Sequence, residues 1–323
     1  MYRRMLVPLD GSELAEVVFA YAEELAGRLD IDIVMFHVSS PSASAFMPMQ
    51  KAYIRHAAIT VRRRAREVQE STSPGTVEKP LEVRGEMVVG YPADEILRYA
   101  EAKENEIDII MMAAHGHSGL RRWTIGSVAS KVLISSKIPV WLVRAGDTGE
   151  DLLDKLQTKT MLVPLDGSEI AETAVLPHVE ALAKQRGTEP MDVVLLKISE
   201  PPSIPSYYGP EISGVSLNWG DYVQQETTRR KQKSTDYLNR VEERLKASNI
   251  SVRSEVIEGK AVDEIVEYAS KHPVDLIVMA THGRSGLSRL VYGSVAANLL
   301  HGVSNPILMV KPQKPEGEIK REE

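Results

Sequence analysis

The chain repeats a long segment of itself, and this repeat constrains the fold more than any other feature. The nine residues MLVPLDGSE occur at 5–13 and again, unchanged, at 161–169. A second matched pair, HGHSGL at 115–120 and HGRSGL at 282–287, is followed in both places by GSVA. Solenoid repeats are about 20–50 residues long. A repeat this much longer predicts one globular domain present twice, with equivalent sites in the two copies.

Length and composition agree with two soluble domains. A chain of 323 residues fits two domains of about 150 residues, and 43% hydrophobic with 26% charged residues is ordinary for globular proteins. The absence of cysteine excludes disulfides, thiolate catalysis and cysteine-bound zinc. A net charge of −6 disfavours nucleic acid and anionic membranes as partners. No apolar run approaches the roughly 20 residues of a membrane helix, and we expect a cytoplasmic protein.

Both copies alternate apolar strands with amphipathic helices, which predicts an α/β fold with a doubly wound parallel sheet in each. The strands expected in the first copy are 4–8, 31–38, 77–84, 108–114 and 138–143, and in the second 161–164, 192–198, 252–257, 275–280 and 307–310. The helices expected between them are 10–28, 50–70, 92–103, 127–135, 169–186, 222–247, 262–271 and 294–300. Domain 1 is expected at 1–145, a linker at 146–158, domain 2 at 159–312 and a disordered tail at 313–323.

The repeated motifs lie at strand ends, where open α/β sheets bind ligands. Asp10 follows the first expected strand, and its carboxylate suits ribose hydroxyls or an adenine amino group. Gly126 and Ser127 begin a helix after the fourth strand, where free amides and a hydroxyl suit phosphate. If the two strands are neighbours, these groups form one crevice with the polarity of a nucleotide. The second copy offers Asp166, Gly283, Gly293 and Ser294.

At these residues the chain resembles a tandem universal stress protein over about 3–144 and 159–312. ATP-binding members of that family share Gly-x2-Gly-x9-Gly-(Ser/Thr) after the fourth strand. Both copies here keep the spacing but begin with alanine, Ala113 and Ala280. The resemblance implies a five-stranded sheet of order 3-2-1-4-5 in each domain, and one ATP site per domain, with Mg²⁺ as a companion of the phosphates. The nucleotide-binding residues that it implies are Pro8, Leu9, Asp10, Val38, Met112, Ala113, His115, Gly116, Gly126, Ser127 and Val128, and Pro164, Leu165, Asp166, Ile198, Met279, Ala280, His282, Gly283, Arg284, Gly293, Ser294 and Val295.

Plainer interpretations compete with these assignments. The two aspartates could simply cap the following helices, and the Gly-Ser pairs could serve only as turn and cap residues. His115 and His282 suit positioning or phosphate contact better than catalysis, and no metal site is expected. The basic runs 62–66 and 229–233 are most simply solvated helix faces. The long loop 199–220 is a candidate lid or contact arm.

The function expected from these features is regulatory nucleotide binding in a stress response. The sequence has no Gly-x4-Gly-Lys-(Ser/Thr) loop, no Gly-x-Gly-x2-Gly turn and no nucleophile elbow, so an enzyme is not expected. The alternatives are a nucleotide-free interaction scaffold, with Trp123 and Tyr292 among the side chains that would block the crevices, and a slow ATPase. The resemblance also implies that 140–143 and 307–310 pair as edge strands, while a homodimer and an unknown protein partner stay open.

Overall fold

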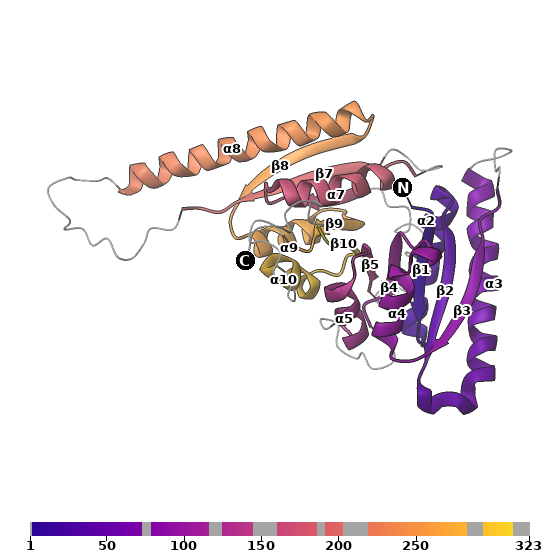
Figure 1. Cartoon of the computed structure of the whole chain (residues 1–323). Coiled ribbons are helices and arrows are strands. Elements are labelled where there is room, and N and C mark those ends of the chain that lie inside the picture. The colour runs from indigo at the N-terminus through magenta and orange to yellow at the C-terminus, as the bar shows by residue number, and fades with distance from the viewer. Residues whose placement is uncertain are drawn as a thin grey trace, which may run out of the picture.

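The structure, a computed structural model, describes residues 2–72, 79–115, 125–144, 160–185, 191–202, 219–282 and 293–312. Its strands form one ten-stranded sheet that runs through two α/β domains (Figure 1). The first domain contributes β1 (Arg4–Leu9), β2 (Asp32–Ser39), β3 (Val83–Val89), β4 (Ile109–Ala113) and β5 (Val140–Val143). The second contributes β6 (Thr160–Pro164), β7 (Asp192–Ser199), β8 (Ser251–Glu258), β9 (Leu276–Ala280) and β10 (Ile307–Val310).

The strand order is β3-β2-β1-β4-β5-β10-β9-β6-β7-β8. Each domain therefore has the parallel order 3-2-1-4-5, which confirms the predicted fold. The pairing of β1 with β4 places Met5 opposite Ile109 and Leu6 opposite Ile110. β6 and β9 pair in the same way, through Met161 and Leu276. The strands that carry the two repeated motifs are thus neighbours in both copies.

Helices cover both faces of the sheet. They are α1 (Glu13–Glu16), α2 (Val18–Leu29), α3 (Met47–Thr72), α4 (Pro92–Glu101), α5 (Ser127–Ser135), α7 (Glu169–Leu182), α8 (Trp219–Ala247), α9 (Ala261–Lys271) and α10 (Ser294–Gly302), with short 3-10 turns η1 (Pro41–Phe46) and η2 (Lys103–Asn105). Residues of α2, α3, α7 and α8 share one apolar core, and residues of α4, α5, α9 and α10 share the other. Because strands buried on both faces need apolar side chains throughout, β4 and β9 are continuous apolar runs, and so is β1 after its first residue, Arg4.

The two domains join through their last strands, as the resemblance implied. β5 and β10 run antiparallel, with Trp141 opposite Leu308, Leu142 opposite Ile307 and Val140 opposite Met309. Trp141 and Leu308 hold the same place in the repeat, so the pairing has a pseudo-two-fold axis at this pair. Both side chains are buried. The seam closes the exposed edge that each domain would otherwise leave.

Basic side chains cross the seam in both directions. Arg144, directly after β5, donates to the carbonyl oxygen of Leu300 in α10. Lys311, directly after β10, donates from Nζ to the carbonyl oxygen of Ile134 in α5 at 3.1 Å. Each cation reaches the C-terminal turn of a helix in the other domain, where carbonyl groups are unsatisfied and the helix dipole favours positive charge.

A second contact between the domains is a buried hydrogen bond. The hydroxyl of Tyr2 lies 2.6 Å from Nδ1 of His178 in α7, and the two side chains are 7% and 8% exposed. Burial raises the pKa of Tyr2, with a smaller contribution from the negative charge of Asp108. Burial also lowers the pKa of His178 to about 4. The pair is therefore held neutral near pH 7.

The predicted bounds of the third strand in the first copy were wrong. Residues 77–84 were expected, whereas β3 is Val83–Val89, and residues 77 and 78 lie outside the described residues. Pro80 lacks the N–H that a strand ladder needs, and Leu81 instead donates its N–H to Oε1 of Gln69 at 3.4 Å. β3 lies at the sheet edge, where partly exposed side chains give a weaker alternating pattern.

Smaller differences concern the helices. The expected helix 10–28 is divided into α1 and α2 at Val17. α3 begins at Met47, and residues 41–46 of the expected loop form η1. The linker 146–158, the tail 313–323 and residues 203–218 of the candidate lid lie outside the described residues.

Candidate functional site

Asp10 and Asp166 lie at the carboxyl ends of β1 and β6, each in a tight turn. Oδ1 of Asp10 accepts hydrogen bonds from the N–H of Ser12 at 3.0 Å and from its hydroxyl at 2.6 Å. Oδ1 of Asp166 accepts the same two bonds from Ser168, at 2.9 and 2.7 Å. The glycine between each pair has φ +85°, a left-handed conformation that strains other residues. The turn therefore has the same hydrogen bonds in both copies.

The serine of each turn, and not the aspartate, caps the following helix. Ser12 is the N-cap of α1 and accepts from the N–H of Ala15 at 3.2 Å. Ser168 is the N-cap of α7 and accepts from the N–H of Ala171 at 3.3 Å. The interpretation of the aspartates as caps is thus wrong. Each aspartate instead accepts two hydrogen bonds from the cap serine, and its carboxylate lies at the carboxyl end of the strand.

The helices that follow the neighbouring strands β4 and β9, α5 and α10, have no such cap. α5 and α10 begin after the N-caps Gly126 and Gly293, which supply no side-chain hydrogen bond, and their first turns contain no acidic residue. Ser127 and Ser294, at the first helical positions, are exposed. The first N–H groups of a helix need acceptors from elsewhere, and their positive end favours an anion.

Gly126 and Gly293 bring these helix ends back to the sheet. The N–H of Gly126 donates to the carbonyl oxygen of Ala114 at 2.8 Å, and that of Gly293 to Thr281 at 3.0 Å. A Cβ at either glycine would lie 3.3 Å from that carbonyl oxygen. β4 adjoins β1, and β9 adjoins β6. Each uncapped helix N-terminus therefore follows the carboxyl end of a strand whose neighbour ends in an aspartate.

The other predicted residues divide into strand ends and core. Pro8, Leu9, Met112, Ala113, Leu165 and Met279 are buried, whereas Val38, Val128, Pro164, Ile198, Ala280 and Val295 are partly buried. The positive-φ residues other than glycine are Asp30, Glu106 and Asn249 among those described. The alanines at the first motif position therefore have ordinary backbone conformations and need no glycine. Gly116, Gly283 and Arg284, with the competing Trp123 and Tyr292, lie outside the described residues.

The same domain appears twice in comparisons with known proteins. The profile of the Universal stress protein family (Usp) matches residues 1–144 and again 157–311. The chain belongs to the universal stress protein family. The family assignment covers both domains, as the repeat predicted.

Relatives of this universal stress protein include single-domain and tandem chains. It is 29% identical over 168 residues to Universal stress protein MJ0531 of Methanocaldococcus jannaschii, covering 52% of this chain and 88% of that one. It is 22% identical over 316 residues to Universal stress protein Rv2005c of Mycobacterium tuberculosis, covering 95% and 96%. A crystal structure of a universal stress protein from Archaeoglobus fulgidus aligns with a TM-score of 0.62 at 19% identity, over 96% of this chain and 98% of that one. The last comparison supports the fold of the whole tandem chain.

The histidines at the two crevices have different surroundings. Burial, together with the positive charge of Arg144, lowers the pKa of His115. His282 is buried, and its Nδ1 lies 3.0 Å from Oγ1 of Thr281, where the first copy has Ala114. A lowered pKa makes this imidazole a weaker base, because burial and the nearby cation both disfavour the imidazolium. His115 fits a positioning role better.

Sequence reasoning missed one pair of aromatic residues at the crevices. The hydroxyls of Tyr53 in α3 and Tyr237 in α8 are buried and have no hydrogen bond of ordinary length among the described residues. Burial raises the pKa of both, and Glu16 with Asp10 adds to the effect at Tyr53, as Glu172 with Asp166 does at Tyr237. The two tyrosines hold the same place relative to the repeated aspartates. Alignment of the long helices on these tyrosines would have found them.

Other features add little chemistry. No group of three or more His, Asp or Glu side chains in the described ranges is arranged to hold a metal ion. None of the helices that the structure describes is long and apolar enough to span a membrane. The basic run on α8 is largely ion-paired, since Arg229 and Arg230 contact Glu226, and Lys231 contacts Glu258.

Proposed function

We propose that this universal stress protein binds one adenine nucleotide in each domain, and that the nucleotide is ATP. The observation that carries the proposal is a pair of features that the chain builds twice, at the carboxyl ends of neighbouring strands. In each copy one strand ends in an aspartate whose carboxylate accepts a hydrogen bond from a serine hydroxyl. The neighbouring strand is followed by a helix whose N-terminus has no side-chain cap. The carboxylate suits ribose or adenine, and the helix N-terminus suits phosphates.

The residues present fit such a ligand. Asp10 and Asp166 would accept from ribose hydroxyls or the adenine amino group, beside the backbone of Val38 and Ile198. The amides at the start of α5 and α10, with the hydroxyls of the Gly-Ser pairs, would take the phosphates, and Mg²⁺ would accompany them. The contrast with α1 and α7, whose N-termini a serine caps and an acidic side chain complements, supports an external anion at α5 and α10.

The same geometry favours binding over turnover. Transition states of phosphoryl transfer need positioned cations and a group that orients the nucleophile. The sequence carries no phosphate-loop lysine, and burial, together with the positive charge of Arg144, lowers the pKa of His115 and makes it a weaker base. We propose that occupancy by nucleotide regulates the protein in a stress response, through stability and partner binding. A site filled at a hundredfold excess over its Kd stabilises the fold by about 2.7 kcal/mol.

Titration calorimetry of the nucleotide-stripped chain with ATP tests this function. We expect close to two ATP per chain for the natural sequence, and close to one for Asp10→Ala and for Asp166→Ala. Ser12→Ala is the matched control, because it removes the hydroxyl that donates to Asp10, together with the α1 cap, and keeps the carboxylate, so two sites should remain.

Two results would contradict the proposal. No binding heat at millimolar ATP would favour a nucleotide-free scaffold. Steady release of ADP that disappears in the double variant Ser127→Ala and Ser294→Ala would show an ATPase.

A further inference from the structure

A groove lies at the outer edge of the first domain, between α3 and β3. It encloses about 600 Å³. The residues that line it are Lys51, Ile54, Arg55, Ala58, Ile59 and Arg62 of α3, and Val83, Arg84, Gly85, Glu86 and Met87 of β3. The groove is remote from both nucleotide crevices in the sheet order, because β3 is the outermost strand and β1 and β4 are inner strands.

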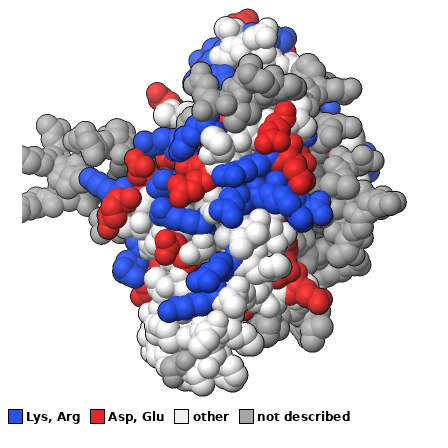
Figure 2. Space-filling view, turned by 90° about the vertical axis from the view of Figure 1, so that its right-hand side faces the viewer, with Lys and Arg blue, Asp and Glu red and all other residues white. Residues whose placement is uncertain are grey.

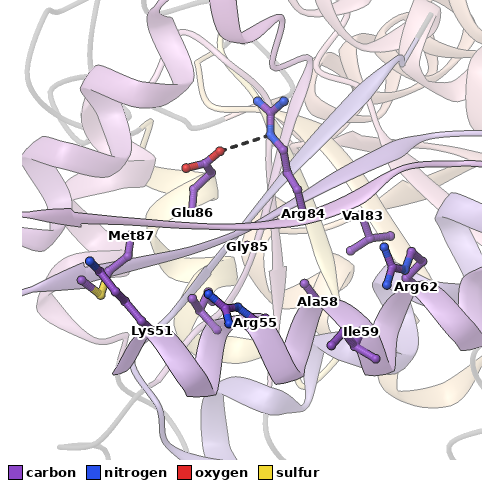
Figure 3. Close-up of a pocket in the computed structure, with 11 residues that line it drawn as sticks. Lys51, Arg55, Ala58, Ile59, Arg62, Val83, Arg84, Gly85, Glu86 and Met87 are labelled. Carbon is purple, nitrogen blue, oxygen red and sulfur yellow. Dashed lines mark ion pairs between the residues drawn. The ribbon is translucent and has the colours of Figure 1, made fainter. Parts of the chain in front are cut away.

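The helix side of the groove is basic. Figure 3 shows Lys51, Arg55 and Arg62 on α3, whereas Arg84 and Glu86 lie on the far side of β3 and pair with each other at 3.5 Å. Among the residues that the structure describes, none of the three α3 cations makes an ion pair. Lys and Arg side chains gather in the middle of this face of the molecule, with Asp and Glu side chains beside them (Figure 2). The groove therefore presents positive charge without matching negative charge.

The strand side of the groove offers backbone hydrogen-bonding groups. β3 ends the strand order, so β2 is its partner on one side only. The carbonyl oxygen of Glu82 accepts from Ile33 at 2.8 Å, and the N–H of Gly90 donates to Ser39 at 3.0 Å. In a parallel ladder alternate residues pair with the same neighbour. Even-numbered residues of β3 therefore face β2, and the backbone of Val83, Gly85 and Met87 faces outward.

The groove also has an apolar component. Ile59 is 50% exposed between Arg55 and Arg62, and Ile54, Ala58, Val83 and Met87 also line the groove. A free strand edge beside a helix with cations and an apolar side chain matches an extended peptide that alternates acidic and apolar residues. The main chain of such a peptide supplies hydrogen bonds, and its alternate side chains supply specificity.

The second domain lacks this surface at the corresponding place. β8 repeats the pattern of β3, with VRSE at 252–255 for VRGE at 83–86. With α8 aligned to α3 on Tyr237 and Tyr53, the residues Lys51, Arg55, Ala58, Ile59 and Arg62 correspond to Thr235, Asn239, Glu242, Glu243 and Lys246. Glu242 pairs with Lys246 at 2.6 Å and also accepts a hydrogen bond from the hydroxyl of Ser254. The basic groove is therefore particular to the first domain.

We propose that the α3–β3 groove binds an extended acidic segment of a partner protein as an eleventh strand on β3. Charge complementarity and the open strand edge select this occupant. Single-stranded nucleic acid is disfavoured, because base stacking needs aromatic side chains and the lining residues include none. A second copy of this groove is disfavoured as well, because two basic surfaces repel each other.

Fluorescence anisotropy with the full chain tests the proposal. The probe is a labelled nine-residue peptide in which glutamate and valine alternate. The double variant Arg55→Gln with Arg62→Gln should weaken binding about tenfold. Lys233→Gln with Lys246→Gln removes the same charge from α8, and it should leave the affinity within about twofold.

Two N-methylated peptides separate strand addition from charge attraction alone. One carries methyl groups on the glutamate amides and the other on the valine amides. Because alternate amides of an added strand face β3, one peptide should lose binding and the other should keep it. Equal affinity of both, no binding at about 1 mM peptide, or a single-stranded RNA that binds through Arg55 and Arg62 and displaces the peptide would overturn the proposal.

Discussion

The inner and outer parts of the two domains differ in how closely they repeat each other. At the inner strands the Asp-Gly-Ser turns of Asp10 and Asp166 have the same hydrogen bonds to within 0.1 Å. At the outer strands the α3–β3 groove has three cations without an ion pair to any described residue, whereas the equivalent place on α8 has two glutamates, two neutral polar residues and a lysine paired with Glu242. One chain thus combines two equivalent crevices with two different edges.

This difference separates two tasks. A nucleotide site needs a fixed set of groups at the switch point of the sheet, and two sites need that set twice. An edge strand has no such requirement, so it is free to carry a surface for one partner. We infer that the tandem chain binds a nucleotide in each domain and presents a basic groove only in the first domain.

The largest effect is expected at the β5–β10 seam, which joins the two copies. Trp141→Ala removes a buried ring from the β5–β10 pairing, and we expect the free energy of unfolding to fall by about 3–5 kcal/mol. Urea unfolding followed by circular dichroism measures this. Tyr91→Ala, at a side chain that is 74% exposed, is the control, with a change within about 0.5 kcal/mol. Equal effects would show that the seam does not support the fold.

Acid should reveal a second asymmetry between the copies. His178 has a folded pKa of about 4, and its place in the repeat is Ala22 in the first domain. The histidine of the unfolded chain has a pKa near 6.5. Between about pH 4 and pH 6.5 the unfolded chain therefore binds a proton that the folded chain does not. The contribution of His178 to the free energy of unfolding is therefore fully present above about pH 6.5. The free energy of unfolding falls as the pH drops toward 4, by about 2 kcal/mol between pH 7 and 4.5.

Urea unfolding across that pH range measures the effect, with His178→Gln as the comparison. The variant should lack this part of the acid loss. An identical pH dependence in both proteins would show that His178 does not cause the loss of stability in acid.

The cap serines test whether the inner regions are equivalent. Ser12→Ala and Ser168→Ala should each cost about 1 kcal/mol of stability, because each removes one N-cap hydrogen bond. Ser127→Ala, which removes no cap bond, should change the stability of the nucleotide-free chain by less than about 0.5 kcal/mol. Chemical denaturation compares the three. A large cost for only one of the two cap serines would break the equivalence.

The sequence predicted the repeat and most strands directly, whereas the strand order 3-2-1-4-5 came from the family resemblance and the structure confirms it. Local patterns suffice for β1, β4 and their counterparts, because fully buried strands are apolar throughout. β3 was misplaced because an edge strand is only partly buried and Pro80 obscured its start. Arg144, Lys311 and the Tyr2–His178 bond connect residues far apart in the chain, and no local pattern encodes such contacts. The groove was missed because the basic run 62–66 contributes only Arg62 to it, and Arg55 and Lys51 lie about two and three helical turns earlier.

Native mass spectrometry of the full chain with both ATP and the acidic peptide tests the central contrast most directly. It counts both ligands on the same molecule. Equivalent crevices and unequal edges predict a dominant species with two nucleotides and one peptide per chain. A species with one nucleotide at saturation, or with two peptides, would contradict the account.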